Sequence, residues 1–391
     1  MKAFIMDAIW DPKPEYSPDT RELNDKRAIR SDLVYRSVKT GLVNAPIPRI
    51  GDHDVLIKVG TCGICGSDMH AGNMGNDGYT QFSGHLRLPV ILGHEFSGEV
   101  IEAGKNVVGV RVGDLIAVEQ IRPCGACDAC KMGFFNNCRN IEEIGLSMDG
   151  GFCEYAAVPE KYCCSINGIA DLLGNKIAAF EAGALAEPIG VSYNGIMVGG
   201  GGITPGTHVA VFGGGPIGLA AIALAKAAGA ARVFAIVKGE ERSRLAKACG
   251  ADEIFHPLEL KAQGISVSSL ILESTHGIGC RTVVEAAGAP DSTFPEIVQL
   301  MSINARVVVL GRSPRLAPVD LEQFIVKGCR LSGSIGTAGS DIIPSVVRMM
   351  ATGRLDLRNI ITGRFPLAGI EEGMCSAKTG RHGKVMISQF Y

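Results

Sequence analysis

The sequence lacks long hydrophobic runs and a strong net charge. It has no apolar run of the roughly 18 residues that a membrane-spanning helix needs, and its amino terminus shows no signal-peptide pattern. The formal charge of −2 gives no electrostatic reason to bind nucleic acid or an anionic membrane. Aromatic residues are sparse at 6%, whereas 46% of residues are hydrophobic, which suits a well-packed α/β protein. We therefore expect a cytoplasmic protein without a membrane or nucleic-acid partner.

Cysteine is plentiful, yet a disulfide framework is not its expected use. The chain holds 13 cysteines, an odd number, and the cytosol keeps thiols reduced. Cys124, Cys127, Cys130 and Cys138 follow the spacing C-x2-C-x2-C-x7-C in a glycine-bearing loop. Four thiolates so spaced suit a closed structural zinc site, because one loop can wrap the ion and leave no position for substrate. An iron–sulfur site and unrelated buried thiols are the alternatives.

Length and pattern predict two domains of different character. At 391 residues the chain exceeds the size at which a single core usually splits. Short strand-like runs and glycine turns occupy the first part, whereas strands alternate with helices after about residue 200. We expect an α/β protein with a Rossmann, doubly wound parallel sheet in residues 193–335. A β-rich catalytic domain would comprise residues 1–192 and 336–391, with 11–40 as an irregular surface excursion.

A glycine-rich turn marks the start of the predicted parallel sheet. It lies between an apolar strand and a helical stretch, and it fits G-x-G-x-x-G with Gly213, Gly214, Gly215, Pro216, Ile217 and Gly218. Glycines at these positions permit a tight turn and close approach of a pyrophosphate, which the N–H groups of the helix amino terminus can bind. The strand–turn–helix context predicts dinucleotide binding, whereas a glycine turn alone is a weak signal.

The position that usually binds the ribose lacks its acid. An acidic residue is expected about 20 residues after the turn, but Val237 occupies that place and Lys238 follows it. The missing carboxylate removes a charge that would repel a 2′-phosphate, and Lys238 or Arg242 could attract one. NADP is therefore slightly favoured over NAD, unless Lys238 is simply a solvated loop lysine.

A second set of candidate metal ligands is scattered along the chain. It comprises Cys65, His94, Glu95 and Glu187, in the segments Gly-Ile-Cys-Gly-Ser-Asp, Gly-His-Glu and Ala-Glu-Pro. Scattered ligands with few cysteines suit a catalytic zinc, which keeps one position open for water or substrate. Each fragment alone is weak, because a lone cysteine or histidine more often belongs to the core or the surface. The same chain also contains a dinucleotide turn and a four-cysteine loop. Together, these features indicate that the scattered residues form a metal site.

Together these motifs resemble the zinc-containing medium-chain alcohol dehydrogenase family over essentially the whole chain. Alcohol dehydrogenases proper carry cysteine where Glu187 stands, so the Ala-Glu-Pro segment favours the polyol (sorbitol) branch. Residues 10–15, the excursion after them and residues 199–203 look most like the inositol-type, or scyllo-inosose, dehydrogenases. The resemblance implies a partly barrel-like, GroES-like catalytic domain and a homo-oligomer, either a dimer or a tetramer.

The resemblance also implies roles around the catalytic metal. Cys65 and His94 would ligate zinc, and either Glu95 or Glu187 would supply the carboxylate. The other glutamate would ligate directly, act through a water or move during turnover. Asp68 would hydrogen-bond the far nitrogen of His94 and fix its tautomer.

Two further residues and one loop would serve the substrate. Ser67 would hydrogen-bond the zinc-held hydroxyl, and His70 would relay its proton to solvent by way of the ribose hydroxyls. Most of the substrate pocket would come from residues 72–89. The polar side chains of that loop suit a polyhydroxylated ligand, although a solvated loop would look the same; they are Asn73, Asn76, Asp77 and Tyr79.

The expected function is hydride transfer between a secondary alcohol of a polyol, or the matching ketone, and NAD(P). One catalytic and one structural zinc would be bound per chain. Cyclic polyols or inososes are favoured, and sorbitol, butanediol and L-threonine are alternative substrates. A non-redox epimerase or lyase that oxidises its substrate only transiently is a further alternative. A binding protein built on such a fold would have lost metal ligands, and both sets are intact here.

Overall fold

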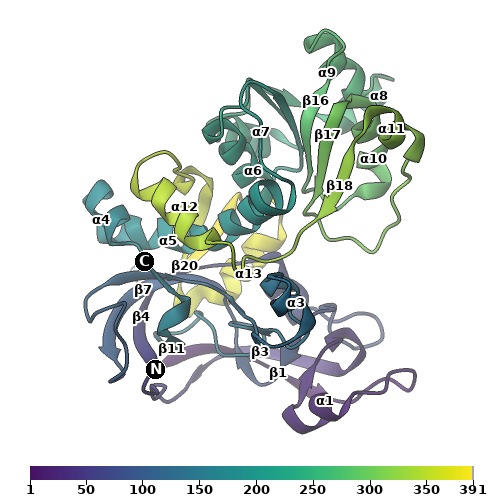
Figure 1. The fold of residues 1–391 in the computed structure, drawn as a ribbon. Coiled ribbons are helices and arrows are strands. Elements are labelled where there is room, and N and C mark those ends of the chain that lie inside the picture. The colour runs from purple at the N-terminus through teal and green to yellow at the C-terminus, as the bar shows by residue number, and fades with distance from the viewer. Residues whose placement is uncertain (390–391) are drawn as a thin grey trace.

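The computed structural model describes residues 1–389, which form a β-rich region and a region of alternating strands and helices (Figure 1). The β-rich region contains a seven-stranded sheet and a three-stranded sheet, and the other region contains a six-stranded sheet. Within the described part of the chain, no helix combines the length and the apolar composition needed to traverse a bilayer.

Strand β4 (Asp54–Gly63) lies at the centre of the seven-stranded sheet and pairs antiparallel with three other strands. It is buried along most of its length, as its valine- and isoleucine-rich sequence suggests. One of its partners comes from close to the carboxyl end, so the last strand of the chain joins the sheet of the β-rich region. The remaining strands are β7 (Glu95–Ala103), β8 (Leu115–Val118), β11 (Tyr155–Pro159), β12 (Cys163–Ser165), β19 (Ile361–Pro366) and β20 (Lys384–Ser388).

The amino-terminal segment is more ordered than its sequence predicts. Strand β1 (Lys2–Trp10) pairs antiparallel with β3 (Tyr35–Asn44), and β6 (Val90–Ile91) completes the three-stranded sheet. Helix α1 (Thr20–Asp25) lies between β1 and β3, where Asp19 and Glu22 form a capping box. The expectation of an irregular excursion over residues 11–40 is therefore wrong in part. A positive φ at Ser37 and a register shift in β1 disturb the alternation that would have revealed β3.

The six-stranded sheet is wholly parallel and has the order β15-β14-β13-β16-β17-β18. Strand order reverses on either side of β13, which makes its carboxyl end a topological switch point. The strands are β13 (His208–Phe212), β14 (Arg232–Ile236), β15 (Glu253–Phe255), β16 (Cys280–Glu285), β17 (Met301–Val309) and β18 (Arg330–Gly333).

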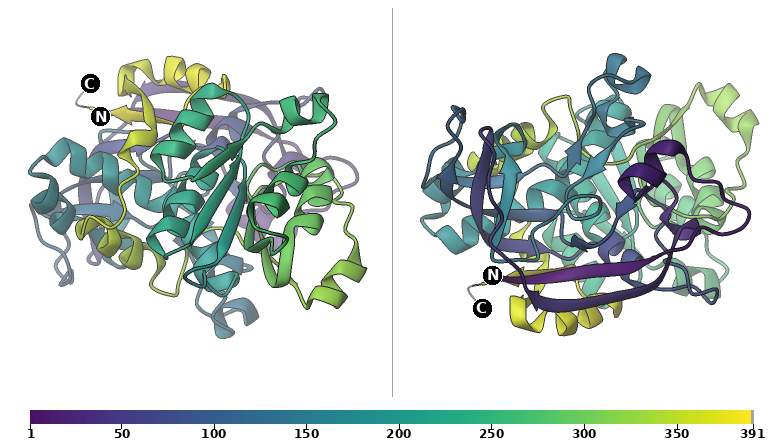
Figure 2. Two further views of the ribbon diagram at one scale, coloured as in Figure 1. Left: turned by 90° about the horizontal axis from the view of Figure 1, so that it is seen from above. Right: turned by 90° about the horizontal axis from the view of Figure 1, so that it is seen from below.

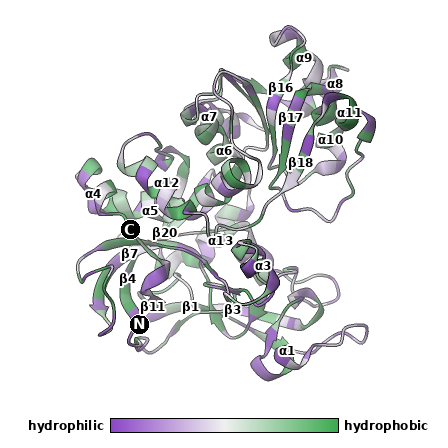
Figure 3. Ribbon diagram, viewed as in Figure 1, coloured by the Kyte–Doolittle hydropathy of each residue, from purple (hydrophilic) through white to green (hydrophobic). Residues whose placement is uncertain are grey.

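Helices cover both faces of this parallel sheet (Figure 2). Alternate residues of β13 belong to different cores: Val209 packs in the same cluster as Leu219, and Ala210 in the same cluster as Ile297. Apolar residues are correspondingly concentrated in the central strands (Figure 3). The predicted doubly wound α/β fold is thus confirmed. The covering helices include α6 (Pro216–Ala227), α7 (Glu240–Ala248), α9 (Val267–Ser274) and α10 (Pro290–Leu300).

Helix α5 (Lys176–Tyr193) joins the two regions. It packs across β4, β7 and β8 on one side and against α6 and α12 (Ile342–Ala351) on the other. One hydrophobic cluster therefore runs from the seven-stranded sheet through α5 to the parallel sheet. This continuous packing fixes the relative position of the two sheets and of the groups at their facing edges.

A buried carboxyl beside β8 predicts a pH-dependent stability. Burial raises the pKa of Glu119 from 4.5 to about 7, although the backbone of Gly339 opposes the shift by donating a hydrogen bond. The unfolded chain therefore ionises first, and stability falls as the pH rises between these two values. We predict that the melting temperature of the wild type falls relative to that of Glu119→Gln between about pH 5 and about pH 8, because glutamine keeps an acceptor and carries no charge.

Thermal melts of the metal-loaded protein across this range provide the measurement. Glu102→Gln, which changes an exposed carboxylate on β7, is the matched control and should follow the wild type. A difference between Glu119→Gln and the wild type that stays constant with pH would contradict the prediction.

Candidate functional site

Three potential ligands converge where β4 and β7 lie side by side. Cys65 follows β4 and caps helix α2 (Gly66–Gly72), whereas His94 and Glu95 lie at the start of β7. The two segments become neighbours because Gly63 pairs with Glu95 across the sheet. Donor atoms of Cys65, His94 and Glu95 all lie within 4.8 Å of one another, close enough to share one ion.

Asp68 holds both Cys65 and His94 in position. One carboxylate oxygen lies 3.2 Å from Nδ1 of His94, and the other accepts the backbone N–H of Cys65 at 2.9 Å. Burial disfavours the imidazolium, but the charges of Asp68 and Cys65 outweigh burial and raise the pKa of His94 well above its usual value. The opposite ring nitrogen, Nε2, lies 3.4 Å from the hydroxyl of Ser67. Asp68 can therefore fix the tautomer and orientation of the ring.

Glu95 also forms an ion pair that sequence reasoning missed. Its carboxylate contacts the ammonium of Lys384, the first residue of β20, and both side chains are almost fully buried. Burial lowers the pKa of Lys384, but Glu95 and Cys65 raise it by more. A Cβ at Gly63 would lie too close to both side chains of the pair, so a larger residue there would force the pair to shift. The one sequence signal is a lysine at the head of a strand that is buried throughout.

Glu187 lies beside this cluster without belonging to its closest set. It projects from α5, is 5% exposed and is absent from the group of donors that lie within 4.8 Å of one another. Burial raises its pKa to about 7; the charge of His94 opposes this shift, and that of Glu95 adds to it. Of the two glutamates left open by the sequence, the structure thus brings Glu95 to Cys65 and His94.

The charges and donor types at this centre suit a divalent cation. Among residues 1–389, three buried carboxylates and the Cys65 thiol are accompanied by the buried side chains of Lys384 and His94 as sources of positive charge. Uncompensated buried negative charge is costly, so a bound cation would stabilise the arrangement. One sulfur, one imidazole nitrogen and one carboxylate oxygen are ligands that zinc accepts, and three protein ligands leave a position open.

The four predicted structural ligands also lie together. The sulfurs of Cys124, Cys127, Cys130 and Cys138 are all within 4.8 Å of one another, around α3 (Asp128–Lys131) and η2 (Phe135–Asn137). Backbone N–H groups stabilise the thiolate of Cys124 and lower its pKa to about 6, and they also lower that of Cys127. Four sulfurs with amide donors aimed at them fit a closed zinc site.

The glycine turn has the shape that a dinucleotide phosphate requires. Gly213 has a φ of 113° and leaves no room for a side chain against the backbone of Ala286. Gly218 lies against the carbonyl of Gly213, so a Cβ there would also clash. Helix α6 starts at Pro216, and no side chain caps its free N–H groups. The turn therefore offers an anion site at the switch point of the sheet.

The two cationic side chains near the ribose position differ in whether they are already hydrogen-bonded to the protein. Val237 is buried after β14, and Lys238 is exposed beside it. Arg242 donates from its guanidinium to the carbonyl of Gly214 and, at 2.9 Å, to that of Gly380. Its charge is therefore already hydrogen-bonded to the protein backbone, whereas Lys238 extends into solvent.

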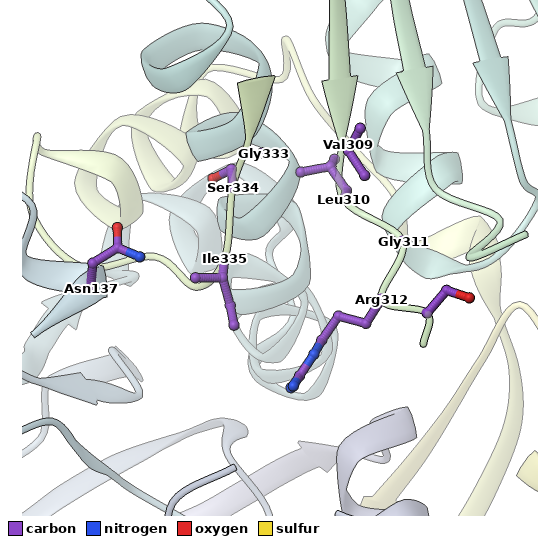
Figure 4. Close-up of a pocket in the computed structure, with 9 residues that line it drawn as sticks. Asn137, Val309, Leu310, Gly311, Arg312, Gly333, Ser334 and Ile335 are labelled. Atoms are coloured by element: carbon purple, nitrogen blue, oxygen red, sulfur yellow. The ribbon is translucent and has the colours of Figure 1, made fainter. Parts of the chain in front are cut away.

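A cavity of about 370 Å³ opens at the carboxyl ends of β17 and β18 (Figure 4). Leu310 and Arg312 follow β17, Ile335 follows β18, and Asn137 reaches the same space from the four-cysteine lobe. His70 lines a different cavity, of about 450 Å³, on the exposed side of α2. The first cavity thus lies between the four-cysteine lobe and the carboxyl edge of the parallel sheet, the edge that also carries the glycine turn after β13.

Comparison with known proteins agrees with both halves of this arrangement. Residues 51–168 match the alcohol dehydrogenase GroES-like domain, and residues 216–352 match the zinc-binding dehydrogenase family. The predicted GroES-like architecture is thereby confirmed.

Relatives align over nearly the whole chain. Scyllo-inosose 3-dehydrogenase of Thermotoga maritima is 36% identical over 384 residues, which cover 95% of each protein. L-threonine 3-dehydrogenase of Caldanaerobacter subterraneus subsp. tengcongensis is 34% identical and covers 90% of this chain and 96% of its own.

Solved structures extend the comparison to three dimensions. One from Thermotoga maritima superposes with a TM-score of 0.94 at 35% identity and covers 99% of both chains. A zinc-binding dehydrogenase of Sinorhizobium meliloti 1021, solved with NADP bound, has a TM-score of 0.76 at 29% identity and covers 93% of this chain and 98% of its own. The chain therefore belongs to the zinc-dependent alcohol dehydrogenase family and is a dehydrogenase.

Proposed function

We propose that this dehydrogenase oxidises a secondary hydroxyl of a polyol, or reduces the matching ketone, with cyclic polyols and inososes as the first choice. The observation that carries the proposal is the ligand set of Cys65, His94 and Glu95, in which a carboxylate joins one sulfur and one imidazole. Glu187, where alcohol dehydrogenases proper carry cysteine, adds to it. The 36% identity to a scyllo-inosose 3-dehydrogenase supports the cyclic class of substrate.

Two metal sites follow from the geometry. In the proposal, Cys65, His94 and Glu95 hold the catalytic zinc, and Glu187 approaches it through a water or during turnover. Lys384 pairs with the carboxylate of Glu95 and would offset part of the negative charge of the ligand set. The four cysteines of the lobe hold the structural zinc.

When bound, zinc lowers the pKa of the substrate hydroxyl, and the nicotinamide ring takes up the hydride. The protein holds the two reacting carbons together and excludes water from the cleft. Asp68 keeps His94 in one tautomer, and the hydroxyl of Ser67, close to Nε2 of His94, would accept a hydrogen bond from the substrate hydroxyl and take its proton only as it gives up its own toward the ribose hydroxyls. His70, exposed on the same helix, passes that proton to solvent through the ribose hydroxyls.

For the coenzyme, we favour NADP slightly over NAD. Phosphates would bind at Gly213, Gly215, Pro216, Ile217 and Gly218, where α6 begins. Val237 offers no carboxylate to the ribose, and exposed Lys238 is the cation available to a 2′-phosphate. Arg242 would help mainly by bracing Gly214. The relative solved with NADP supports this preference.

The domain limits, assembly and location complete the proposal. Residues 1–192 and 336–391 form the catalytic domain, and residues 193–335 bind the dinucleotide.

Homo-oligomerisation is supported by the exposed edge strand β18 and by apolar side chains of α11 (Leu321–Lys327), where Ile325 is 75% exposed. All 13 cysteines are free, as expected in the reducing cytoplasm.

A substrate panel tests the proposal directly. We expect an inositol or inosose to be turned over with the highest kcat/KM among inositols, inososes, sorbitol, 2,3-butanediol and L-threonine, with NADP at least equal to NAD. L-threonine is the second candidate because a 34% identical relative carries that activity in its name. Absorbance at 340 nm follows net coenzyme reduction, and product formed without it would indicate an epimerase or lyase. If only simple primary alcohols react, the polyol assignment fails.

Loss of the catalytic ligands should abolish turnover while leaving the fold largely intact. We predict this for Cys65→Ala and His94→Ala, and a loss of about 10–100-fold in activity or metal affinity for Asp68→Asn, which only orients a ligand. Steady-state kinetics and metal content per chain provide the measurement. His53→Ala, an exposed histidine, is the control. A near-normal rate in a variant without the catalytic metal would contradict the assignment.

Loss of a structural ligand should act on stability first. We predict that Cys127→Ser lowers the melting temperature by several degrees or more, because metal binding to the lobe contributes folding free energy. Cys375→Ser, which changes an exposed cysteine on α13 (Ile370–Lys378), should leave it unchanged. An unaltered melting curve for Cys127→Ser would refute the structural role.

A further inference from the structure

The backbone of Glu143 is held rigidly. It ends the short strand β10 (Glu142–Glu143), where it pairs with Ile121 of β9 (Ile121–Arg122). Its N–H donates to the hydroxyl of Ser147 at 2.8 Å, and its carbonyl accepts N–H groups from the turn that follows. Ser147 itself is fully buried, so the backbone of Glu143 has little freedom.

The carboxylate of Glu143 has no use in the fold. Among the described residues it accepts no hydrogen bond and forms no ion pair, whereas the adjacent Glu142 pairs with Arg27 at 3.6 Å. Burial raises the pKa of Glu143, and the charges that oppose this shift are those of His94 and Arg312. Two residues further along, Gly145 lies against the backbone of Gly93 and His94, so the segment that carries Glu143 adjoins the candidate metal centre.

Arg312 approaches the same space from the other domain. It follows β17 at the carboxyl edge of the parallel sheet, and its side chain extends away from the strands toward the β-rich region (Figure 4). Backbone N–H groups of Leu310 and Gly311 bond to Glu285 and fix the base of this segment. The guanidinium reaches the hydroxyl of Ser83 at 3.4 Å, inside the loop expected to line the substrate pocket. No carboxylate forms an ion pair with it in the described part of the chain.

We propose that Glu143 and Arg312 form a specificity pair that recognises the hydroxyl groups next to the reacting carbon of a polyol. The proposal rests on the proposed function and names the residues that select its substrate class. Glu143, an ionised acceptor, takes a hydrogen bond from one neighbouring hydroxyl. Arg312, a donor only, gives hydrogen bonds to another hydroxyl or to a ketone oxygen.

The pair explains discrimination against simple alcohols. A hydroxyl group both donates and accepts, so a polyol can satisfy an acceptor on one side and a donor on the other. A simple alcohol presents no second hydroxyl, so it leaves the carboxylate of Glu143 without a hydrogen-bond donor. Sites built on hydrogen bonds reject analogues that lack the bonding group far more strongly than apolar pockets do. The two residues come from different domains, so substrate also bridges the cleft.

The test compares myo-inositol with cyclohexanol, which has the same ring and a single secondary hydroxyl. In the zinc-loaded enzyme, we expect Glu143→Gln and Arg312→Gln each to lower the ratio of kcat/KM for myo-inositol over cyclohexanol by about tenfold or more, mainly through KM. The melting-temperature increase that myo-inositol gives in the presence of coenzyme should shrink in parallel. Glu142→Gln and Arg315→Gln, whose charges pair with Arg27 and Asp291, are the matched controls and should keep the wild-type ratio.

The outcomes separate the pair from the function on which it rests. If the wild type prefers myo-inositol and the ratio is unchanged in both variants, the pair is wrong while the polyol activity stands. An equal loss on both substrates would likewise overturn it, because that pattern indicates a general defect. If the wild type neither oxidises nor binds myo-inositol, inososes or sorbitol, the polyol function fails and the pair fails with it.

Discussion

The candidate catalytic centre depends on a buried ion pair between Glu95 and Lys384. The pair ties the first residue of β7 to the first residue of β20, directly beside Gly63, where a Cβ would displace it. Removing one partner would leave the other charge buried, at a cost of about 3–5 kcal/mol. The lysine also decides how much negative charge the centre carries. Because Lys384 neutralises Glu95, less negative charge is left for a bound divalent cation to balance. The pair therefore serves both the attachment of β20 to the sheet and the affinity of the site for that cation.

The four-cysteine lobe has a wider influence than its closed ligand set suggests. Asn136 of the lobe donates to the carbonyl of Ile335 at 2.8 Å, where the chain returns from the parallel sheet, and Ile121 packs against Gly336. After Cys138, the last cysteine of the lobe, the chain enters β10 within a few residues. A metal in the lobe would therefore stiffen both the contact between the domains and the strand that carries Glu143. In this arrangement a site that cannot bind substrate still determines where a substrate-facing carboxylate stands.

The features that could be predicted from sequence are those fixed by local geometry. The glycine turn and the cysteine loop each lie within one short segment, so spacing alone carries the constraint, and alternating strands and helices gave the doubly wound sheet. The choice of carboxylate could not be made, because Glu95 and Glu187 lie on a strand and a helix whose approach depends on the tertiary packing of α5. Arg312 gave no local signal for the same reason, and Lys384 gave only that of a lysine at the head of an apolar strand. Strand β3 was missed because a positive φ at Ser37 breaks its period.

For coenzyme selection, the hydrogen bonds of Arg242 change which cation is available to a 2′-phosphate. In the sequence, Arg242 and Lys238 are equivalent cations near a ribose site without an acid. In the structure the guanidinium of Arg242 joins the glycine turn to the segment at Gly380, and burial lowers its pKa. If Arg242 bound a 2′-phosphate instead, the carbonyls of Gly214 and Gly380 would lose their hydrogen bonds to its guanidinium. The glycine turn would then lose this support. Selectivity for the phosphate then falls on Lys238, an exposed and flexible side chain whose attraction is screened by solvent and salt. The proposed preference for NADP, resting on one such lysine, would therefore be weak.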